Sequence, residues 1–241
     1  MSTPRRRIRG LAFDLEGTVV DVEAAHHHGH LAAAKEFGLE LSLAEAYAKL
    51  PHIIGGPDEK VCSDILSLLD PDTRNHRNQV TLGEILACTQ AHYARLLAEM
   101  PIAPRRGFLE FYARARDLGL KLTIGSATSE EQAVTLLKRS GLMSLFGQRN
   151  IVLREHVTNL KPAPDVFLKT ASIMGIDPSD QLVFEDSPRG VQAALTAGSQ
   201  AVGMPVVIRA LTVGALVDAG ACRIFFDWGE INVSALIENL S

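Results

Sequence analysis

Acidic side chains stand at two places where an apolar run gives way to a turn. Asp14 and Glu16 follow the run Ile8–Phe13, and the pair Glu185-Asp186 follows Gln181–Phe184. Carboxylates this close to a buried strand are costly unless a cation neutralises them. The spacing therefore predicts acid–base or metal chemistry at two strand ends. The alternatives need no function: an ordinary turn at Asp14, and a helix cap at Asp186 or Ser187.

Two further strand ends carry groups suited to phosphate. The run Lys121–Gly125 leads into Ser126-Ala127-Thr128-Ser129, and amides and hydroxyls at the start of a helix can hold a phosphate. Helix capping by Thr128 or Ser129 is the alternative. Lys161 precedes Pro162 and Pro164, which should hold it in a loop before a helix, with its ammonium available as a point charge. An ordinary surface lysine is the alternative there.

The elements that must position these groups alternate along the chain. Short runs rich in β-formers lie at Ile8–Phe13, Lys121–Gly125, Ile151–Val152, Gln181–Phe184, Gln200–Val202 and Arg223–Phe226. Helix-like stretches follow at Gly107–Leu118, Ser129–Ser140, Pro164–Met174, Arg189–Ala197 and Thr212–Asp218, several ending at Gly119, Gly141, Gly175 or Gly198. This alternation predicts a parallel sheet covered on both faces, with ligands at the carboxyl ends of its strands.

One segment, Val22–Met100, lacks any strand run. It holds amphipathic stretches at Ala24–Phe37, Leu43–Leu50, Glu59–Leu69 and Asn78–Glu99, separated by proline and glycine. The predicted fold is therefore α/β, a Rossmann-like parallel sheet with an inserted all-helical bundle. We expect a discontinuous core of residues 1–20 and 101–241, interrupted by a cap of residues 21–100.

Composition excludes several classes of partner. The 241 residues carry 24 Lys and Arg against 28 Asp and Glu, a net charge of −4 that does not favour nucleic acid. Arg5–Arg7 and Arg9 are expected to be a solvated lead-in to the first strand. No apolar run approaches the ~20 residues of a membrane span, and the start lacks a signal-peptide core, so a cytoplasmic protein is predicted. Three scattered cysteines predict neither a disulfide framework nor a structural zinc site.

The four strand-end groups, taken in order, resemble the motifs of the haloacid dehalogenase-like (HAD) superfamily. Those motifs are an Asp-x-Asp-Gly-Thr strand end, a Ser or Thr strand end, a lysine and an acidic pair. The helical insertion, the segment Lys161-Pro-Ala-Pro-Asp165, and Glu185-Asp186-Ser187 with Gly190 are most similar to its β-phosphoglucomutase/phosphoglycolate phosphatase branch. The resemblance covers essentially the whole chain.

The resemblance implies a Mg²⁺-dependent hydrolase, most simply a phosphatase of a small phosphorylated metabolite such as a sugar or polyol phosphate. Asp14 would be the nucleophile that forms an aspartyl-phosphate. The implied metal ligands are Asp14, the Glu16 backbone carbonyl, Asp186 and, directly or through water, Glu185. The implied phosphate-binding groups are Lys161, the Ser126 hydroxyl and the Ala127 amide. Such an enzyme would be a monomer or a homodimer.

Glu16 departs from the family pattern, which has aspartate two residues after the nucleophile. That aspartate protonates the leaving oxygen and later activates water. Glutamate keeps the carboxyl group but is one methylene longer, which changes its reach. We expect Glu16 to retain acid–base chemistry. The alternative is a catalytically weak domain that serves as a binding or regulatory module.

The insertion carries further expectations. His26 falls where a cap-hinge histidine of β-phosphoglucomutase-like proteins contacts the acid–base residue, so it would orient Glu16. A metal site at His26 and His30, four residues apart, is the less favoured alternative. The loop His52–Lys60 corresponds to a substrate-specificity loop, with His52 or Lys60 as polar contacts.

Two other reactions of the superfamily are weighed against phosphatase chemistry. The loop His52–Lys60 has no arginine to grip a second phosphate, which disfavours a phosphosugar mutase, although Arg74 and Arg77 could substitute. Their alternative role is surface solubility. A 2-haloacid dehalogenase is disfavoured because that branch needs no Mg²⁺, whereas Glu16 and the pair Glu185-Asp186 favour a metal.

Overall fold

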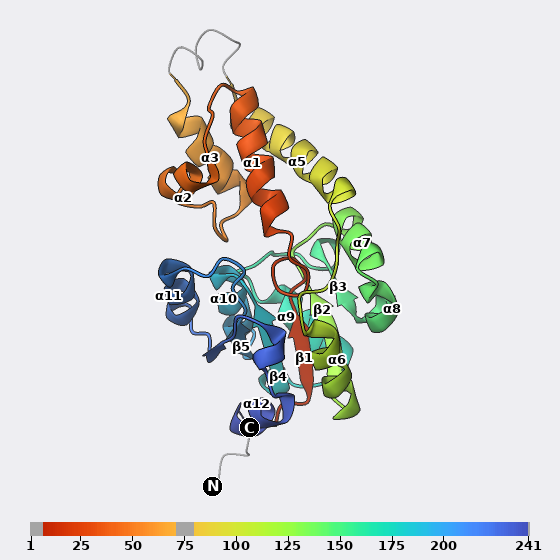
Figure 1. The fold of residues 1–241 in the computed structure, drawn as a ribbon. Coiled ribbons are helices and arrows are strands. Elements are labelled where there is room, and N and C mark those ends of the chain that lie inside the picture. The colour runs from red at the N-terminus through yellow and green to blue at the C-terminus, as the bar shows by residue number, and fades with distance from the viewer. Residues whose placement is uncertain (1–6, 71–79, 241) are drawn as a thin grey trace. The chain divides into compact units, whose positions relative to one another are not determined.

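The structure is a computed structural model that describes residues 7–70 and 80–240 (Figure 1). The chain divides into two compact units, residues 1–21 with 102–241 and residues 22–101. Arg5, Arg6, Arg74 and Arg77 lie outside the described residues. Arg9 is exposed and pairs with Asp180 at 3.6 Å, as a solvated lead-in would.

The first unit is built on a parallel sheet with β1 in its centre. In the described residues six strands are ordered β3-β2-β1-β4-β5-β6, and all neighbouring pairs are parallel. Their bounds are β1 Gly10–Phe13, β2 Lys121–Gly125, β3 Ile151–Val152, β4 Gln181–Glu185, β5 Gln200–Gly203 and β6 Arg223–Ile224. Phe13 is in register with Ile124 of β2 and Phe184 of β4. The carboxyl ends of β1, β2 and β4 are therefore level and adjacent.

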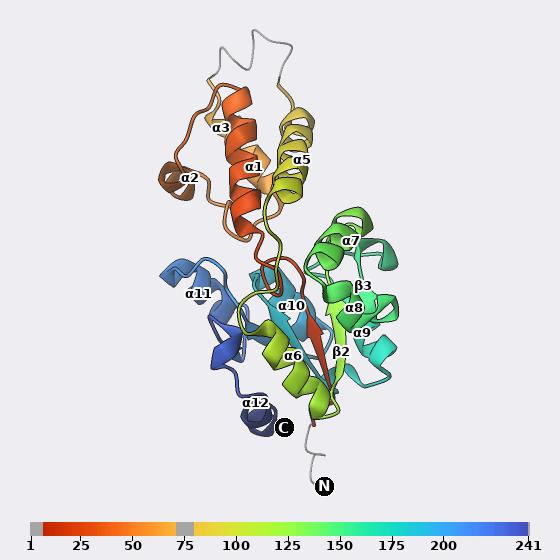
Figure 2. The same cartoon turned by 45° about the vertical axis from the view of Figure 1, so that its right-hand side comes forward.

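Alternating side chains of β1 and β4 bury both faces of the sheet. On one face the rings of Phe13 and Phe184 stack at 5.4 Å, and Phe13 also meets Phe108 and Trp228 edge to face. Phe108 belongs to α6 (Phe108–Asp117), which lies in front of the sheet in Figure 2. On the other face, a second apolar cluster is formed by Ala12 and Val183 of the strands with residues of α9 (Asp165–Met174), α10 (Pro188–Thr196) and α11 (Ala210–Asp218).

Several helices end as their glycines predict. Gly119, Gly141, Gly175 and Gly198 all adopt positive φ angles after helices. The first unit also contains α7 (Glu130–Arg139), α8 (Leu142–Phe146) and α12 (Val233–Leu240). The sequence did not predict α8 or α12, because five- and eight-residue helices give too few turns for a clear periodicity.

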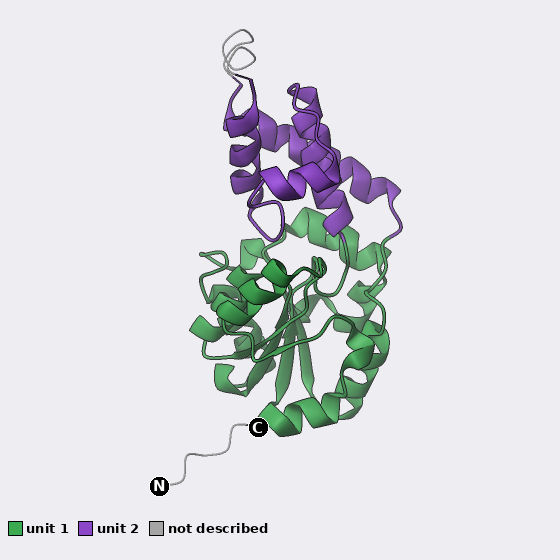
Figure 3. Ribbon diagram, turned by 60° about the vertical axis from the view of Figure 1, so that its left-hand side comes forward, with its two compact units in different colours: residues 1–21, 102–241 green, residues 22–101 purple. Residues whose placement is uncertain are grey.

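The second unit is all helical over its described residues (Figure 3). It contains α1 (Glu23–Glu36), α2 (Leu43–Lys49), α3 (Asp58–Leu68) and α5 (Leu82–Glu99). Capping boxes of Ser42 with Glu45 and of Thr81 with Glu84 start α2 and α5. Buried apolar side chains, among them Ala34, Leu50, Ile65 and Ile85, form its core. The predicted α/β sheet with an inserted helical cap is confirmed. Across residues 7–70 and 80–240, no helix has both the length and the apolar character to traverse a membrane.

Candidate active site

Lys161 is buried between two carboxylates at the carboxyl ends of β1 and β4. Its Nζ donates to Asp14 Oδ1 at 2.5 Å and to Glu185 Oε1. The three residues are at most 7% exposed, so the alternative of a surface lysine is wrong. The Asp14 amide donates to the Phe184 carbonyl at 3.0 Å, which continues the β1–β4 pairing up to the site.

Burial has the largest effect on the pKa of Asp14. It raises the pKa of Asp14 to about 7, with Lys161 acting against the rise and Glu185 adding to it. Burial alone would lower the pKa of Lys161, but the charges of Asp14 and Glu185 outweigh it and the pKa is raised. Lys161 is therefore an ammonium at neutral pH. Asp14 and Glu185, together with Asp186 described below, form what we call the acidic site. Their carboxylates carry more negative charge than one lysine neutralises, and this favours a further cation.

Ser187 fixes the carboxylate of Glu185 and caps a helix at the same time. Its amide and hydroxyl donate to Glu185 Oε2 at 3.3 and 3.0 Å, and its hydroxyl accepts from the Gly190 amide at 3.1 Å. A Cβ at Gly190 would lie 1.9 Å from the Glu185 carboxylate. Glycine is therefore required in this turn of α10, and capping by Ser187 accompanies the site instead of replacing it.

Asp186 approaches the turn after β1 in a similar way. Gly17 has φ +79°, and a Cβ there would lie 2.2 Å from Asp186 Oδ2. Thr18 Oγ1 donates to Asp186 Oδ1 at 3.4 Å. Carboxylate oxygens of Asp14, Glu185 and Asp186 all lie within 4.8 Å of one another. An oxygen-only group of this kind fits a hard cation such as Mg²⁺.

Glu16 is held by Thr128, a residue that was predicted from the sequence only as a helix cap. Thr128 Oγ1 donates to Glu16 Oε1 at 2.7 Å and lies 2.9 Å from Ser126 Oγ. The N-cap residue of α7 is Ser129, but its side chain makes no cap hydrogen bond, and the Glu130 amide at that helix end donates to Glu155 Oε2 at 3.0 Å. The interpretation of the Thr128 and Ser129 side chains as helix caps is therefore wrong. Thr128 links the second strand-end group to Glu16, which only the folded geometry reveals.

Ser126 and Ala127 lie at the carboxyl end of β2, as predicted. Ser126 is buried, and its amide donates to the Val152 carbonyl at 2.9 Å. Ala127 is half-buried next to it. The structure thus brings Ser126 and Asp14 to adjacent strand ends. Lys161, predicted to follow a strand end directly, lies instead in the segment between β3 and α9 and reaches Asp14 with its side chain.

Arg105 braces the loops around the site and was not predicted. Its Nη1 donates to the carbonyls of Gly17 and Met204 at 2.8 and 2.7 Å, and its Nη2 donates to Phe226 O at 3.1 Å. These carbonyls follow β1, β5 and β6. The pair Arg105-Arg106 at the return from the insertion carries no local signal for such a role.

His26, His30 and His52 make contacts within the second unit. His26 stacks on Tyr93 with ring centroids 4.0 Å apart, and its proposed contact with Glu16 stays a prediction. His30 Nε2 lies 3.2 Å from Asp58 Oδ1. In the described residues, neither His26 nor His30 belongs to a group of three or more possible metal ligands. His52, from the expected specificity loop, is exposed and pairs with Asp64 at 2.9 Å.

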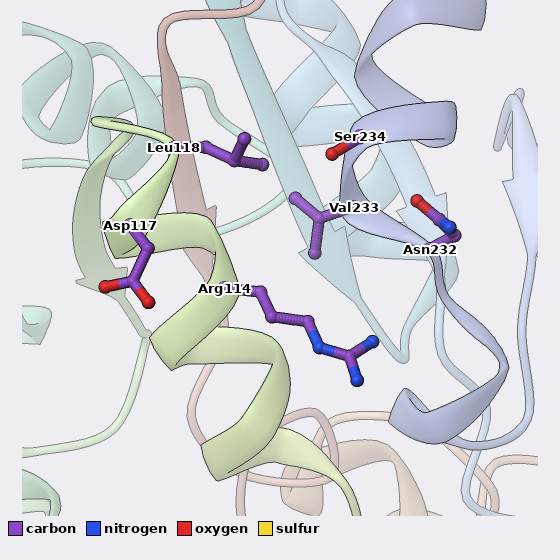
Figure 4. A pocket seen from close by; sticks show the side chains of 6 residues that line it. All are labelled: Arg114, Asp117, Leu118, Asn232, Val233 and Ser234. Atoms are coloured by element: carbon purple, nitrogen blue, oxygen red, sulfur yellow. The ribbon is translucent and has the colours of Figure 1, made fainter.

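A pocket of about 330 Å³ lies elsewhere on the first unit (Figure 4). Its lining comes from α6 and the start of α12: Arg114, Asp117, Leu118, Asn232, Val233 and Ser234. Leu118 precedes β2, so this pocket belongs to the amino edge of the sheet. It is separate from the acidic site at the carboxyl edge.

Comparison with known proteins gives the same class as the fold and the site. The profile of the family described as haloacid dehalogenase-like hydrolase matches residues 11–204. The fructose-1-phosphate phosphatase YqaB of Escherichia coli K12 is 30% identical, over 81% of this chain and 96% of its own length. The plasmid protein CbbY of Cupriavidus necator is 29% identical, over 86% of this chain and 80% of its own length.

The fold also matches solved structures. A HAD hydrolase of family IA, variant 3, from Entamoeba histolytica superposes with a TM-score of 0.78 at 21% identity, covering 96% of this chain and 99% of its own. At that identity the match shows the fold alone. The profile match over residues 11–204 shows that the chain belongs to the haloacid dehalogenase-like hydrolase family.

Proposed function

We propose that this protein is a Mg²⁺-dependent phosphatase of small phosphorylated metabolites, sugar or polyol phosphates in particular. The observation that carries the proposal is the convergence of Asp14, Glu185 and Asp186 within 4.8 Å, with Lys161 buried among them. A carboxylate nucleophile, a cation site and a fixed ammonium are the groups that phosphoryl transfer needs. The name of YqaB, a fructose-1-phosphate phosphatase, supports a sugar phosphate as substrate.

The residues that would hold Mg²⁺ are Asp14, Asp186 and the Glu16 backbone carbonyl, assisted by Glu185. When bound, the ion neutralises phosphoryl charge that would otherwise repel the Asp14 carboxylate. Gly17 and Gly190 give the acidic side chains room to converge. Lys161, the Ser126 hydroxyl and the Ala127 amide would bind the remaining phosphoryl oxygens and stabilise the transition state.

Two transfers complete the proposed reaction. A carboxylate oxygen of Asp14 attacks phosphorus, and the bond from phosphorus to the sugar oxygen breaks while Glu16 gives that oxygen a proton. Water then attacks the phosphorus of the aspartyl-phosphate, and Glu16 takes its proton. The bond between phosphorus and the Asp14 oxygen breaks, which releases inorganic phosphate and restores Asp14 and Glu16.

The contact between Thr128 and Glu16 supports acid–base chemistry at Glu16. A hydroxyl 2.7 Å from Oε1 holds the longer side chain in one orientation, which proton transfer requires. We propose Thr128 as a positioning residue because it acts through Glu16.

The two predicted domains would have different roles. The reacting residues would all come from the core of residues 1–20 and 101–241. In the cap of residues 21–100, His26 would orient Glu16, and the loop His52–Lys60 would provide contacts to the leaving group.

The test is Mg²⁺-dependent phosphate release from a panel of hexose, pentose and polyol phosphates. We expect at least one member to be hydrolysed, with loss of activity in Asp14→Asn and in excess EDTA. Asp117→Asn, an exposed aspartate on α6, is the matched control and should keep full activity. Hydrolysis that persists in Asp14→Asn would overturn the proposal.

The same panel separates the two remaining alternatives. Isomerisation of a phosphosugar that requires a bisphosphate activator, with little phosphate release, would establish a mutase. Specific binding of a phosphosugar without any turnover would establish a binding or regulatory module. Either result would reject the phosphatase assignment.

A further inference from the structure

The helical insertion contains a second group of possible metal ligands, unrelated to the acidic site. Across the described residues, two groups have at least three His, Cys, Asp or Glu side chains with ligand atoms within 4.8 Å of one another. One is the Asp14 group. The other joins Glu36 of α1 to Cys88 and His92 of α5, and we call it the α1–α5 cluster.

The backbone presents these three side chains together. Cys88 and His92 are four residues apart on α5, so they lie on the same face of that helix. Glu36 Oε2 accepts from Cys88 Sγ at 3.3 Å, and Glu36 Oε1 accepts from His92 Nε2 at 2.7 Å. Ligand atoms around a tetrahedral zinc ion are ~3.3–3.8 Å apart. The distances from Glu36 to Cys88 and His92, 3.3 and 2.7 Å, are close to this range, and all three ligand atoms lie within 4.8 Å of one another, so side-chain adjustments would fit an ion among them.

The carboxylate of Glu36 supplies negative charge for a cation, and the nearby guanidinium of Arg95 opposes it. Glu36 is the last residue of α1, where the helix macrodipole is negative and disfavours a carboxylate. The hydrogen bonds from Cys88 and His92 lower the pKa of Glu36, so it is ionised. Burial, together with the hydrogen bond to Glu36, raises the pKa of the Cys88 thiol to about 11. Two protons thus occupy the space between the three ligand atoms in the metal-free protein.

The α1–α5 cluster is open to solvent on one side. The side chain of His92 is 12% exposed and that of Glu36 is 60% exposed, so the ligand on α5 is anchored while solvent reaches the site from the side of α1. Three protein ligands with one side open leave a fourth position for water.

We propose that Glu36, Cys88 and His92 bind one divalent transition-metal ion of the zinc type. Sulfur, imidazole and carboxylate together select such an ion over Mg²⁺, whereas the oxygen-only group at Asp14 has the opposite preference. The ion would join α1 to α5 within the second unit. The sequence predicted no structural zinc site because its three cysteines are scattered. A mixed group of Glu, Cys and His from two helices has no characteristic cysteine spacing, so that prediction does not apply to it.

Binding requires two local changes. The Cys88 thiol loses its proton to solvent, and the sulfur then donates an electron pair to the ion. Arg95 Nη2 lies 2.9 Å from His92 Nδ1 and donates to it, which keeps the proton of the ring on Nε2. For Nε2 to bind the ion, that proton must move to Nδ1 and the exposed Arg95 side chain must turn away.

The experiment is a titration of the full-length, metal-free protein with Co²⁺, followed by its thiolate-to-cobalt absorption band. The Asp14 group contains no sulfur and cannot give this band. The outcome of the titration therefore does not depend on whether that group binds a metal ion or supports phosphatase activity. We expect one equivalent of Co²⁺ to produce the band and Zn²⁺ to displace it. Cys88→Ser should abolish the band, and His92→Gln should weaken Co²⁺ binding at least about tenfold.

Matched variants make the result decisive. Cys222→Ser, a cysteine of the first unit, should keep the band, as should Cys62→Ser on α3. Arg95→Ala should bind Co²⁺ more tightly, because it removes the donor that competes for His92. Absence of the band in a wild-type protein of native circular dichroism, or a band that survives in Cys88→Ser, would overturn the proposal. Weaker binding in Arg95→Ala would overturn the assignment of Nε2 as the ligand.

Discussion

At the scale of single residues, the proposed acid–base chemistry depends on Glu16 and on its contact with Thr128. The Thr128 hydroxyl reaches Glu16 Oε1 at 2.7 Å, a contact that the shorter side chain of aspartate would not make from the same backbone. Thr128 therefore provides a hydrogen-bond partner for the glutamate that stands where the family pattern has aspartate.

A double-mutant cycle tests this pairing. We expect Glu16→Asp to lower turnover about 10- to 100-fold, because the proton donor is displaced. Thr128→Val keeps the shape but loses the hydroxyl, and should lower turnover about tenfold. In the Glu16→Asp background, Thr128→Val should have little further effect, because the contact is already lost. Thr128→Ser is the control that keeps the hydroxyl. A gain in turnover on Glu16→Asp would contradict the account.

Asp14 places a cost on the metal-free fold that depends on pH. Burial raises its pKa to about 7, so between pH 4 and 7 the folded protein holds a proton that the unfolded chain releases. Stability is therefore lost as the pH rises through this window, and stays low above it. Asp14→Asn removes the ionisable group and the cost with it.

We expect Asp14→Asn in EDTA to be more stable than wild type by roughly 2–4 kcal/mol at pH 8. The difference should shrink towards zero below about pH 3, because wild-type Asp14 is then protonated in the folded and in the unfolded state. Urea unfolding at several pH values measures it. A variant that is less stable than wild type at pH 8, or a difference that grows at low pH, would show that Asp14 is not costly to bury.

At the scale of elements, one turn of α10 determines where Glu185 can lie. Alanine at position 190 improves helix propensity by about 1 kcal/mol but places a Cβ 1.9 Å from the Glu185 carboxylate. We expect Gly190→Ala to lower phosphatase activity at least about 100-fold, with the helical content retained. Activity and far-ultraviolet circular dichroism provide the two readouts.

Gly214→Ala in α11 is the control for this substitution. Apart from the adjoining backbone of α11 itself, no atom of the described residues lies within 4 Å of a Cβ built at Gly214, so the variant should gain up to about 1 kcal/mol of stability with unchanged activity. If Gly190→Ala behaved in the same way as Gly214→Ala, the close approach of Gly190 to Glu185 would have no functional meaning.

The strands of the site were predictable because each is a short apolar run that ends in polar residues. The runs before Asp14, Ser126 and Glu185 all proved to be strands, and β1 differs only in beginning at Gly10 instead of Ile8. Interactions between distant residues were not predictable. Thr128 is 112 positions from Glu16, and Arg105 binds carbonyls of three separate loops. Residue type alone does not reveal such partners.

At the scale of the whole molecule, the strand order makes one site from distant segments. Since β1 lies between β2 and β4, Asp14, Ser126 and Glu185 meet at one edge despite their separation along the chain. An ion bound to both Asp14 and Asp186 would link the ends of β1 and β4. It would bind only the folded state and so stabilise the first unit.

Magnesium should therefore raise the melting temperature. At about 100 times its dissociation constant it should add about 2.7 kcal/mol, a rise of roughly 5–10 °C for a chain of this size. Asp186→Asn should lose most of the shift, whereas Asp117→Asn should keep it. Differential scanning calorimetry with Mg²⁺ and with EDTA gives the comparison. An equal shift in Asp186→Asn would place the ion elsewhere.

In the proposed mechanism the phosphoryl group is carried by the Asp14 carboxylate between its transfer from the sugar and its transfer to water. Acid quenching of a reaction with a hydrolysed sugar phosphate, followed by peptide mass spectrometry, detects this directly. The account predicts one added phosphoryl group on the peptide that contains Asp14, more of it in Glu16→Gln, and none in Asp14→Asn. Steady phosphate release by the wild type in Mg²⁺ with no adduct at Asp14, in either wild type or Glu16→Gln, would contradict it.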